Sequence, residues 1–488
     1  MKKLIILSFA CLLATSLFAQ NPADALRYSR FYYGGTARFQ GLGSAMGAVG
    51  ADYSVAATNP AGLGLFKSSE LSISPSFWNS ATSADYSKVT SNDSRFNFGL
   101  ANLGFVFTKN LESKKNPDGL KSITIAFGMN RQNDYSNRTF IEGTNDSSSM
   151  LTEYVNILND NHYNPGVVGE KFPYDIGLAY NPNNNGLIYY DNATGLYNCD
   201  APNGGVYQEK SIKTRGSMNE FNLSLGMNLN DKIYLGATIG IPSIHYVESS
   251  TYRELKQDTS IHYFQSLTYN QYLETRGTGV NLKLGVIYRP FNWVRIGAAV
   301  HTPTYYGNMR DSWHSSMNAV FDDNGHDDAV SPDGYFDYQM ATPFHAIGSL
   351  AFIIGNYGLI TGEYEYVDFG QARFYSSDES FKDVNTDIKN SYTSPVNVRA
   401  GTEWRIGNLR IRGGFGFTGK PYKSALYNGE KYTVSGGLGY RGKHLYSDIA
   451  YIWSQTKDNY YLYDPTLVDP SNNTTTTNNV VLTLGVRF

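Results

Sequence analysis

The connections between strand-like segments constrain the fold of this 488-residue chain more than any single motif does. Beyond the first 70 residues, apolar and polar residues alternate with the two-residue period of β-strands in about fourteen segments. The connections alternate between short turns, such as 230–231 and 407–408, and long polar loops, such as 135–216 and 306–335. Short turns at one end and long loops at the other are typical of membrane-spanning barrels. The pattern predicts an all-β fold, a transmembrane antiparallel β-barrel of about 14 strands.

The predicted strands can be placed by their alternation. They cover residues 70–78, 95–108, 121–134, 217–229, 232–247, 268–289, 293–305, 336–355, 358–369, 394–406, 409–422, 431–441, 445–461 and 479–488. The long connections, expected on the extracellular side, are 79–94, 135–216, 248–267, 306–335, 370–393, 423–430 and 462–478. An even number of strands then places both termini on the periplasmic side of a bacterial outer membrane.

The last predicted strand carries a second signal. One face carries Val480, Leu482, Leu484, Val486 and the terminal Phe488, and the other carries Thr483, Gly485 and Arg487. A terminal aromatic residue on such a strand resembles the C-terminal signal by which outer-membrane barrels are recognised for insertion. This resemblance implies the barrel assembly machinery as a partner that binds the strand ending at Phe488.

Composition supports a barrel that contacts membrane lipids. After the N-terminal 19 residues, no apolar run approaches the roughly 18 residues that a membrane-spanning helix needs. The chain has 39 Tyr, 26 Phe and 48 Gly, yet only 17% of its residues are charged, which fits strands with one lipid-facing side. Trp78, Trp293, Trp404 and Trp453 fall near segment ends, where we expect them at the lipid–water interface. A net charge of −3 argues against a nucleic-acid partner.

The N-terminus reads as a targeting signal. Lys2 and Lys3 precede an apolar run that ends at Leu13, and Ala19 offers a cleavage site, as in a secretory signal peptide. Cleavage there leaves Cys199 as the only cysteine, so no intramolecular disulfide is possible. We therefore expect a signal peptide over 1–19, a small N-terminal domain over 20–69 and the barrel with its long extracellular loops over 70–488.

The stretch from Gly34 to Trp78 differs from the rest of the chain. Gly, Ala and Ser crowd it, which permits close packing and sharp turns, and a regular strand pattern follows at once. Within it, Asn59, Pro60, Ala61 and Gly62 form a turn sequence. This turn, after a Gly/Ala-rich run and before a strand, resembles the N-terminal hatch of the FadL/TodX-type outer-membrane channels for long-chain fatty acids and other hydrocarbons. The resemblance implies a hatch, or plug, inside the barrel.

The resemblance also implies a function. A FadL-like channel would capture a hydrophobic molecule such as a fatty acid at its extracellular loops, pass it to a lumenal pocket and release it when the hatch near Asn59, Pro60 and Ala61 shifts. Such transport is passive and is not enzymatic. One scaffold hosts many functions, so a docking or assembly component, for instance in protein export, is the alternative. A barrel enzyme acting on lipids is a weaker third reading.

Charged residues recur on the predicted inward faces of three neighbouring strands. They can reach one another across the sheet, so we interpret them as an ion-pair network that braces the wall and the hatch. The alternative is that one of the arginines binds the carboxylate of a fatty acid, since a guanidinium matches that group in shape. The residues are Glu363, Glu365, Arg399, Glu403, Arg405, Arg410 and Arg412.

Two remaining patterns have ordinary explanations. The apolar face of the strand over 95–108 changes side near Ala101 and Asn102, which predicts a β-bulge. The acidic loop around Gly325 lacks the spacing of a helical calcium loop, so we read it as a solvated loop. The eight His have no spacing typical of metal ligands, and we expect no metal and no cofactor.

Overall fold

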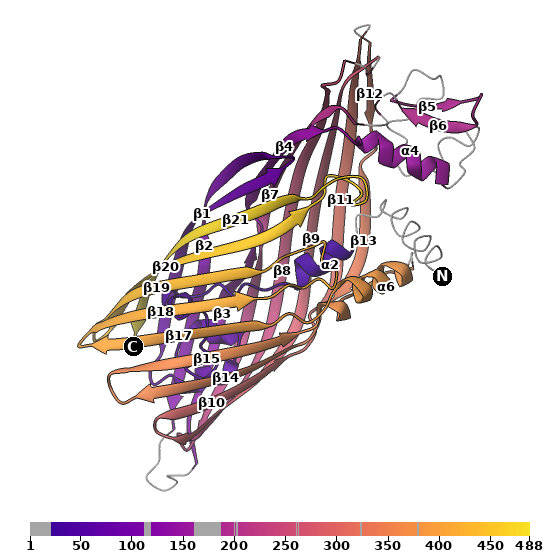
Figure 1. The fold of residues 1–488 in the computed structure, drawn as a ribbon. Coiled ribbons are helices and arrows are strands. Elements are labelled where there is room, and N and C mark those ends of the chain that lie inside the picture. The colour runs from indigo at the N-terminus through magenta and orange to yellow at the C-terminus, as the bar shows by residue number, and fades with distance from the viewer. Residues whose placement is uncertain are drawn as a thin grey trace.

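The computed structural model describes residues 21–111, 119–160, 187–199, 201, 204–259, 261, 263–322, 325–377 and 380–488, so the expected signal peptide lies outside it. Over these residues the chain forms a closed antiparallel barrel of 14 strands, and the last strand pairs with the first (Figure 1). This confirms the predicted fold class. No helix among the described residues is long and apolar enough to cross a membrane.

The wall follows the order of the sequence. Two neighbouring wall strands are each interrupted by a kink. β10 and β11 form the first of them, and β13 and β14 form the second. β10 pairs with β14 below the kink, and β11 pairs with β13 above it. The wall strands are β1 (Glu70–Tyr86), β2 (Val89–Asn110), β3 (Leu120–Asp134), β7 (Val206–Leu229), β8 (Ile233–Lys256), β9 (Phe264–Phe291), β10 (Val294–His301), β11 (Tyr305–Phe321), β13 (Gly334–Ala341), β14 (His345–Ile354), β15 (Gly358–Val367), β17 (Asn397–Ile406), β18 (Leu409–Thr418), β19 (Lys431–Arg441), β20 (Leu445–Tyr460) and β21 (Ser471–Arg487).

Smaller elements lie inside the barrel or at the end that carries the long connections, which we expect to be the extracellular side. The hatch segment, residues 21–69, contains α2 (Pro22–Ser29), α3 (Ala37–Gly41) and the 3₁₀ helices η1 (Tyr53–Ala57) and η2 (Pro60–Leu65). The extracellular elements are β4 (Asn137–Asn145), α4 (Met150–Asp160), β5 (Ile188–Asp191), β6 (Leu196–Cys199), β12 (His326–Val330), η4 (Phe369–Gln371), β16 (Arg373–Tyr375) and α6 (Lys382–Ser391).

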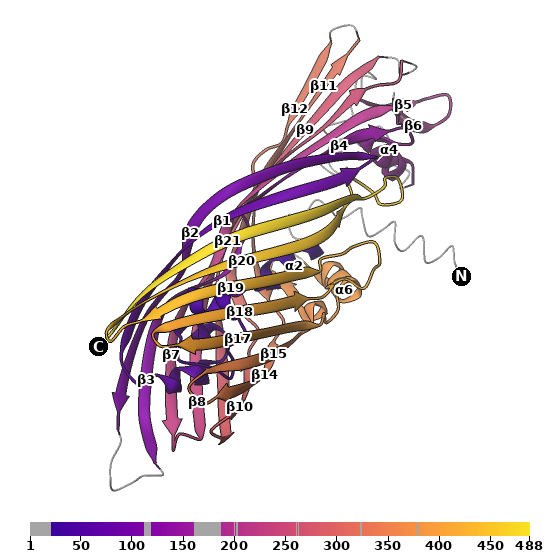
Figure 2. The same ribbon diagram turned by 60° about the vertical axis from the view of Figure 1, so that its left-hand side comes forward.

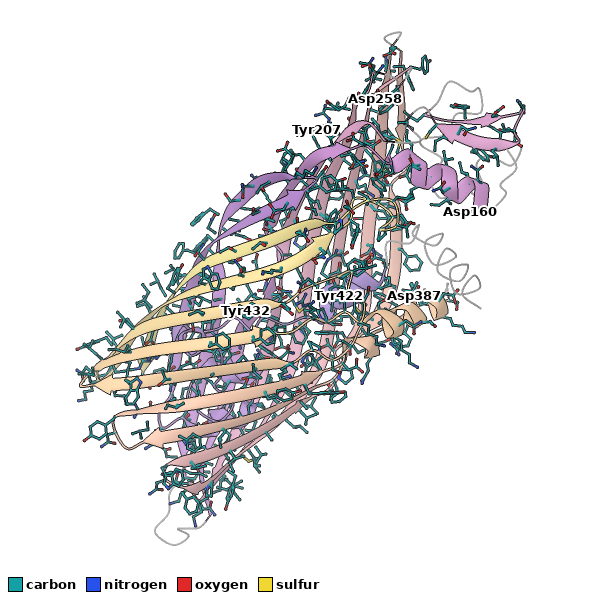
Figure 3. All side chains as sticks on the ribbon, viewed as in Figure 1. Asp160, Tyr207, Asp258, Asp387, Tyr422 and Tyr432 are labelled. Atoms are coloured by element: carbon teal, nitrogen blue, oxygen red, sulfur yellow. The ribbon has the colours of Figure 1, made fainter. Side chains whose placement is uncertain are left out.

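The outer face of the wall is apolar, as a membrane-spanning barrel requires. Side chains cover it along its length, Tyr432 on β19 among them (Figure 3). Large apolar side chains such as Ile125, Leu284 and Leu484 have half or more of their surface exposed. Trp293 and Trp404 are exposed, as expected for the interface, but Trp78 is only 8% exposed and lies under Arg131 inside the barrel. Its predicted interfacial position was therefore wrong.

Several predicted loops are strand. β1 and β2 continue through 79–94 to a turn at Ser87–Lys88, and β21 begins at Ser471 within the predicted loop 462–478. β9 has 28 residues, far more than the 9–11 or so that cross a bilayer, whereas β17 has ten. One side of the barrel therefore rises well above the other (Figure 2). The extensions of β1, β2 and β21 consist mostly of polar residues on both faces, so they carry little alternation that a sequence reading could detect.

The tall side carries a folded extracellular part. α4 and the β5–β6 hairpin lie beside the upper ends of the long strands (Figure 1). They share one apolar core with the upper ends of β7, β8, β9 and β11. Glu254 is buried there and accepts hydrogen bonds from Ser149, the Met150 amide, Gln208 and Tyr252. The described residues of the long loop 135–216 thus form part of a packed structure.

Candidate functional site

The hatch segment lies in the lumen and contacts the wall from several sides. Where it touches the wall, inward positions of seven strands are glycine, and a methyl group there would collide with the segment. At Gly285 and Gly236, near the turn ends of β9 and β8, the colliding atoms belong to Asn59 and Pro60. The segment therefore closes the end of the barrel that carries the short turns. The seven glycines are Gly104, Gly226, Gly236, Gly285, Gly297, Gly401 and Gly414.

Asn59 holds the predicted turn together. It is fully buried and caps η2, because its Oδ1 accepts a hydrogen bond from the Ala61 amide at 3.2 Å. Its Nδ2 donates to the Gly47 carbonyl at 2.6 Å and to the carbonyl of Val286 on β9 at 3.3 Å. Pro60 occupies the first turn of η2, where its missing N–H costs nothing. One side chain thus joins two parts of the segment to each other and to the wall.

Gly62 completes this turn by allowing close approach. Its carbonyl accepts a hydrogen bond from the Ala51 amide at 2.9 Å, and a Cβ at this position would lie 2.8 Å from Val55 Cγ2. Next to the turn, His301 on β10 lies 2.6 Å from the Thr58 carbonyl, so its Nε2 must be the donor. The Asn59–Gly62 motif is therefore anchored on both sides.

The first group of predicted lumenal charges surrounds Arg399. Its Nη2 lies 2.7 Å from Glu363 Oε1 and 2.9 Å from Glu365 Oε2. Glu363 also accepts a hydrogen bond from the Gly47 amide at 2.8 Å, and Glu365 accepts one from the Tyr33 hydroxyl at 2.7 Å. Both carboxylates therefore bind the wall arginine and the hatch segment at once.

The second group surrounds Glu403. Glu403 Oε2 lies 2.8 Å from Arg412 Nε on the next strand and 3.2 Å from Arg38 Nε on α3. Arg412 is completely buried and also reaches Asp448 Oδ1 at 2.6 Å. Arg405 lies 3.5 Å from Glu403 Oε1 on the turn side. The structure therefore places six of the seven predicted charges in two ion-pair groups.

Arg410 is the exception. Its guanidinium donates to the carbonyls of Gly407 and Leu409 at the turn end of the barrel, and it forms no ion pair within the described residues. The alternative interpretation, in which an arginine binds the carboxylate of a fatty acid, requires an arginine without a protein partner. Arg399 is paired with Glu363 and Glu365, and Arg412 is paired with Glu403. This geometry favours bracing over ligand binding at these arginines.

α2 closes the lumen above the hatch turn. Asn21 and Asp24 form a capping box, and the guanidinium carbon of Arg27 lies 4.3 Å from the centre of the Tyr246 ring on β8. Burial raises the pKa of Asp24, although the Arg27 charge beside it acts in the opposite direction. The contacts of Arg27 with the Tyr246 ring and, at 3.9 Å, with Glu248 therefore fix the helix to β8.

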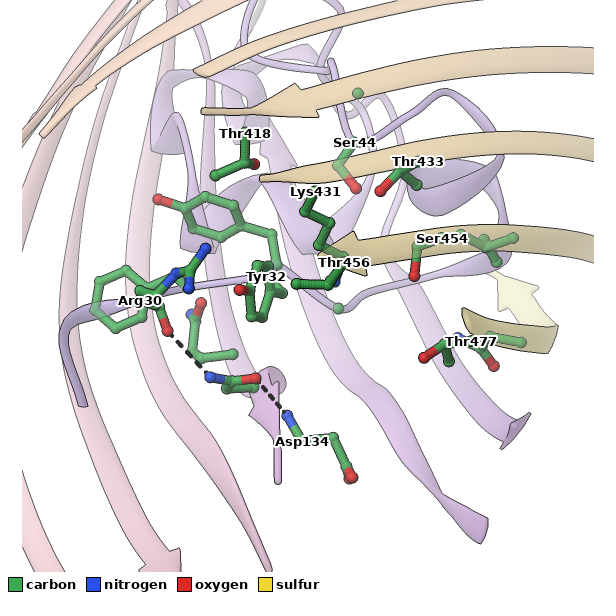
Figure 4. Close-up of a pocket in the computed structure, with 18 of the residues that line it drawn as sticks. Arg30, Tyr32, Ser44, Asp134, Thr418, Lys431, Thr433, Ser454, Thr456 and Thr477 are labelled. Carbon is green, nitrogen blue, oxygen red and sulfur yellow. Dashed lines mark hydrogen bonds between the residues drawn. The ribbon is translucent and has the colours of Figure 1, made fainter. Parts of the chain in front are cut away.

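A cavity of about 500 Å³ lies beside the hatch segment (Figure 4). Arg30–Gly34 form one side, and β18 to β21 form much of the opposite side. Half of the lining residues on these strands carry a hydroxyl group. The hydroxyl-bearing lining residues on these strands are Thr418, Thr433, Ser454, Thr456, Thr475 and Thr477. Sequence reasoning missed this cavity, because the lining side chains meet only after the barrel closes.

The cavity borders a break in the wall. The β1–β2 register shifts at Ala101, which is the predicted bulge, and the β2–β3 ladder begins only at the Asn102–Asn130 pair. Beyond that point the hatch segment takes the place of β2. The amide of Tyr32 donates to the Gln132 carbonyl, and that of Gly34 donates to the Arg131 carbonyl, both at 2.8 Å. Residues 32–34 therefore cover the edge of β3 from inside.

Other binding chemistry has little support. No group of three or more His, Cys, Asp or Glu residues in the part of the chain described here is placed to hold a metal ion. Cys199 is buried and forms no disulfide within the described residues. The acidic residues around Gly325 that could suggest calcium are partly outside the described residues, and His326 and Asp328 there belong to β12.

The geometry defines a class of protein: a plugged transmembrane β-barrel with a lumenal cavity next to a break in its wall. No protein-family model matches the chain, and a search of curated proteins finds no match. Among solved structures, the fold is that of the FadL-type hydrocarbon channels that the sequence pattern indicated.

The likeness extends over nearly the whole chain. A Pseudomonas aeruginosa FadL homologue has a TM-score of 0.55 at 11% identity and covers 94% of this chain and 99% of its own. The Pseudomonas putida toluene transporter TodX has a TM-score of 0.56 at 11% identity, with 93% and 99% covered. The Ralstonia pickettii toluene transporter TbuX has a TM-score of 0.50 at 14% identity, with 93% and 99% covered. At such identities the likeness shows the fold alone.

Proposed function

We propose that the protein is an outer-membrane channel for the passive uptake of hydrophobic molecules, long-chain fatty acids among them. The observation that carries this proposal is the cavity beside the hatch segment, which meets the wall where β2 and β3 are not paired. Outside this region Phe96 and Phe98 are about two-thirds exposed on the apolar surface. A molecule that leaves the cavity here reaches the bilayer without passing the hatch.

The moving part in this mechanism is residues 30–34. Hydrogen bonds without an ion pair hold residues 30–34: the Tyr32 and Gly34 amides donate to β3, the Tyr33 hydroxyl to Glu365 and the Arg30 guanidinium to the Gly429 carbonyl. A buried ion pair holds α3 in addition, and wall glycines surround the Asn59 turn closely. We therefore assign movement to residues 30–34 and a fixed closure to the Asn59 turn. No bound metal or cofactor and no chemical step are required, and the similar solved structures are described as transporters.

In this proposal the C-terminus is periplasmic, on the side of the short turns, and the described chain ends there with an exposed Phe488. The described chain begins towards the other end of the barrel, because α2 shares an apolar core with α6. We also propose that the barrel assembly machinery recognises the C-terminal strand through this residue. The Phe488 amide donates to the Ser69 carbonyl at 3.1 Å, which links the last residue to the start of β1 where the barrel closes.

Reconstitution tests the transport proposal. Liposomes that contain the protein should take up labelled oleate faster than empty liposomes. Trp78→Ala, which changes the cavity, should alter this rate, whereas Trp293→Ala on the outer surface should not. Equal uptake by protein-containing and empty liposomes would reject the proposal.

A docking role in the outer membrane is the second candidate. The folded extracellular part built on α4, β5 and β6 favours it, since transport of a small molecule does not require such a structure. Purification from native membranes distinguishes the two: bound lipid supports transport, and a stoichiometric partner protein supports docking.

A further inference from the structure

Four basic side chains gather on the tall side of the barrel, where β2 runs past β4 and β7 (Figure 2). Lys213 and Arg215 are exposed on the outer face of β7, and Arg138 on β4 is exposed directly opposite Lys213. Arg95 on β2 joins them, because its Nη1 donates a hydrogen bond to the Thr214 carbonyl at 3.0 Å. We call Arg95, Arg138, Lys213 and Arg215 the basic cluster.

Like charges face each other in this cluster. Side chains directly opposite on paired antiparallel strands have Cβ atoms about 4.5–5.5 Å apart, and like charges there destabilise the sheet. Arg138 and Lys213 form such a pair, and Arg215 lies two residues further along the same face of β7. None of the three forms an ion pair or a side-chain hydrogen bond with another residue in the described part of the chain. An anion bound between them would remove the repulsion.

Two carboxylates lie close to Arg95 without pairing with it. Asp93 shares the face of β2 with Arg95 and forms no ion pair within the described ranges. Asp134 attracts Arg95 electrostatically, but its carboxylate is paired with Arg131 at 2.9 Å. The guanidinium of Arg95 therefore keeps most of its charge for a further partner.

The acidic residues further along the outer face are also engaged. Glu209 pairs with Arg253 at 3.0 Å, and Glu142 accepts a hydrogen bond from the hydroxyl of Tyr207, which lies on the outer side of the barrel (Figure 3). With these residues, Asp93, Asp134 and Arg131 included, six basic side chains stand beside four acidic ones. The surface around the cluster therefore retains positive charge.

Apolar surface adjoins the basic cluster. Phe96 follows Arg95 directly on β2, and Phe96 and Phe98 are 69% and 66% exposed. The Phe98 ring lies 5.0 Å from the ring of Phe77 on β1. The cluster therefore lies beside the membrane-facing aromatic surface, at the end of the barrel with the long connections. A molecule that touches both needs acyl chains and an anionic headgroup.

We propose that the basic cluster binds the phosphate groups of a glycolipid in the outer leaflet of the outer membrane, whose acyl chains lie against Phe77, Phe96 and Phe98. A phosphate monoester carries close to two negative charges, and guanidinium groups bind it through paired hydrogen bonds. A free anion would use the cations but not the aromatic surface. The proposal needs the outer-membrane location and the orientation given above, and it is independent of which molecule the barrel transports.

A second opposed pair of arginines on the same side provides a matched control. Arg276 on β9 stands directly opposite Arg310 on β11. Unlike the cluster, each has a carboxylate of its own: Arg276 lies 2.6 Å from Glu274, and Arg310 lies 2.6 Å from Asp337. We expect no phosphate at this pair, because the two carboxylates already offset its charge.

Native mass spectrometry of the purified full-length protein in an uncharged detergent tests the proposal. The probes are lipid A, which carries two phosphates, and the same lipid A with both phosphates removed. One exposed ion pair contributes a factor of about 1.4 to 5, so replacing Arg138, Lys213 and Arg215 together by Gln should weaken lipid A binding about 3- to 100-fold. The triple variant should bind the dephosphorylated lipid like the unmodified protein, and Lys213→Arg should keep its affinity for lipid A.

The controls separate the proposal from its alternatives. Arg310→Gln should bind lipid A like the unmodified protein. Heat-dependent gel mobility shows that each variant is a folded barrel. The proposal is overturned if the triple variant binds lipid A within twofold of the unmodified protein, or if the unmodified protein binds both forms of the lipid equally or neither. Release of lipid A by equimolar inorganic phosphate would assign the cluster to free phosphate instead. Uptake of oleate by liposomes is a separate measurement, so its failure would leave this result standing.

Discussion

Replacing Asn59 should loosen the hatch segment without opening the barrel wall. Asn59→Ala removes three buried hydrogen bonds, those with the Gly47 carbonyl, the Val286 carbonyl and the Ala61 amide. At about 1 kcal/mol net for each bond, the loss is roughly 2–4 kcal/mol. Because 1.4 kcal/mol is a factor of ten, the population of the locally opened hatch should rise about 30- to 700-fold.

The aspartate variant sharpens this prediction. Asn59→Asp keeps the acceptor for the Ala61 amide but places a carboxylate oxygen where Nδ2 lies 2.6 Å from the Gly47 carbonyl. Two acceptors then face each other in a buried site, and an unpaired buried charge costs several kcal/mol. The hatch should therefore open more readily in Asn59→Asp than in Asn59→Ala, although aspartate resembles asparagine more closely in shape.

Hydrogen exchange followed by mass spectrometry measures this effect directly. Peptides covering η1 and η2 should exchange fastest in Asn59→Asp, more slowly in Asn59→Ala and slowest in the unmodified protein. Peptides from β8 and β18 should keep their protection in all three. Asn228→Ala is the matched control, because Asn228 lies at a turn and bonds only to Asp231. Equal exchange of the hatch peptides in all variants would refute the role assigned to Asn59.

Two further predictions concern contacts between the hatch and the wall. Glu403→Gln leaves Arg38 and Arg412 without their shared carboxylate, so it should lower the free energy of unfolding by about 3–5 kcal/mol. Denaturant titrations followed by gel mobility measure this change. The control Glu142→Gln, on the extracellular side, should change the free energy of unfolding little. Gly104→Ala would drive a methyl group into the Tyr53 ring and should cost about 1–3 kcal/mol in the same assay, whereas Gly348→Ala, with nothing within 4 Å of its Cβ, should be neutral.

The wall was predictable because membrane-facing strands carry a periodic signal. Apolar outward residues such as Leu482 and Leu484 alternate with inward ones, and all fourteen segments placed by this pattern coincide with wall strands. The signal stops where the strand leaves the membrane. Residues 89–94 on β2 and 471–478 on β21 have polar residues on both faces and were predicted to be loops, because no periodic pattern there distinguishes inward from outward positions.

The site was only partly predictable, for a related reason. Glu403 and Arg412 could be placed on facing inward positions because they are cross-strand neighbours in a short hairpin. Tyr32 and Lys431 are separated by almost 400 residues and meet only because the hatch segment folds back through the closed barrel. Trp78 was misplaced for a similar reason. Its position near the end of a segment suggested the interface, but Arg131 from β3 holds it in the lumen.

The contacts of the hatch segment show which part of it can move at low cost. From Arg38 to Leu65 it is attached by buried ion pairs, by Asn59 and by wall glycines that leave no room for a shift. Displacing this part would leave Glu403 and Glu363 short of partners, at several kcal/mol each. Residues 32–34 are held by two backbone hydrogen bonds to β3 and by the hydrogen bond from Tyr33 to Glu365, without an ion pair of their own, and they flank both the cavity and the wall break. In the proposed mechanism, the binding energy of a ligand in the cavity is spent on uncovering the edge of β3, while the Asn59 turn keeps the end with the short turns closed.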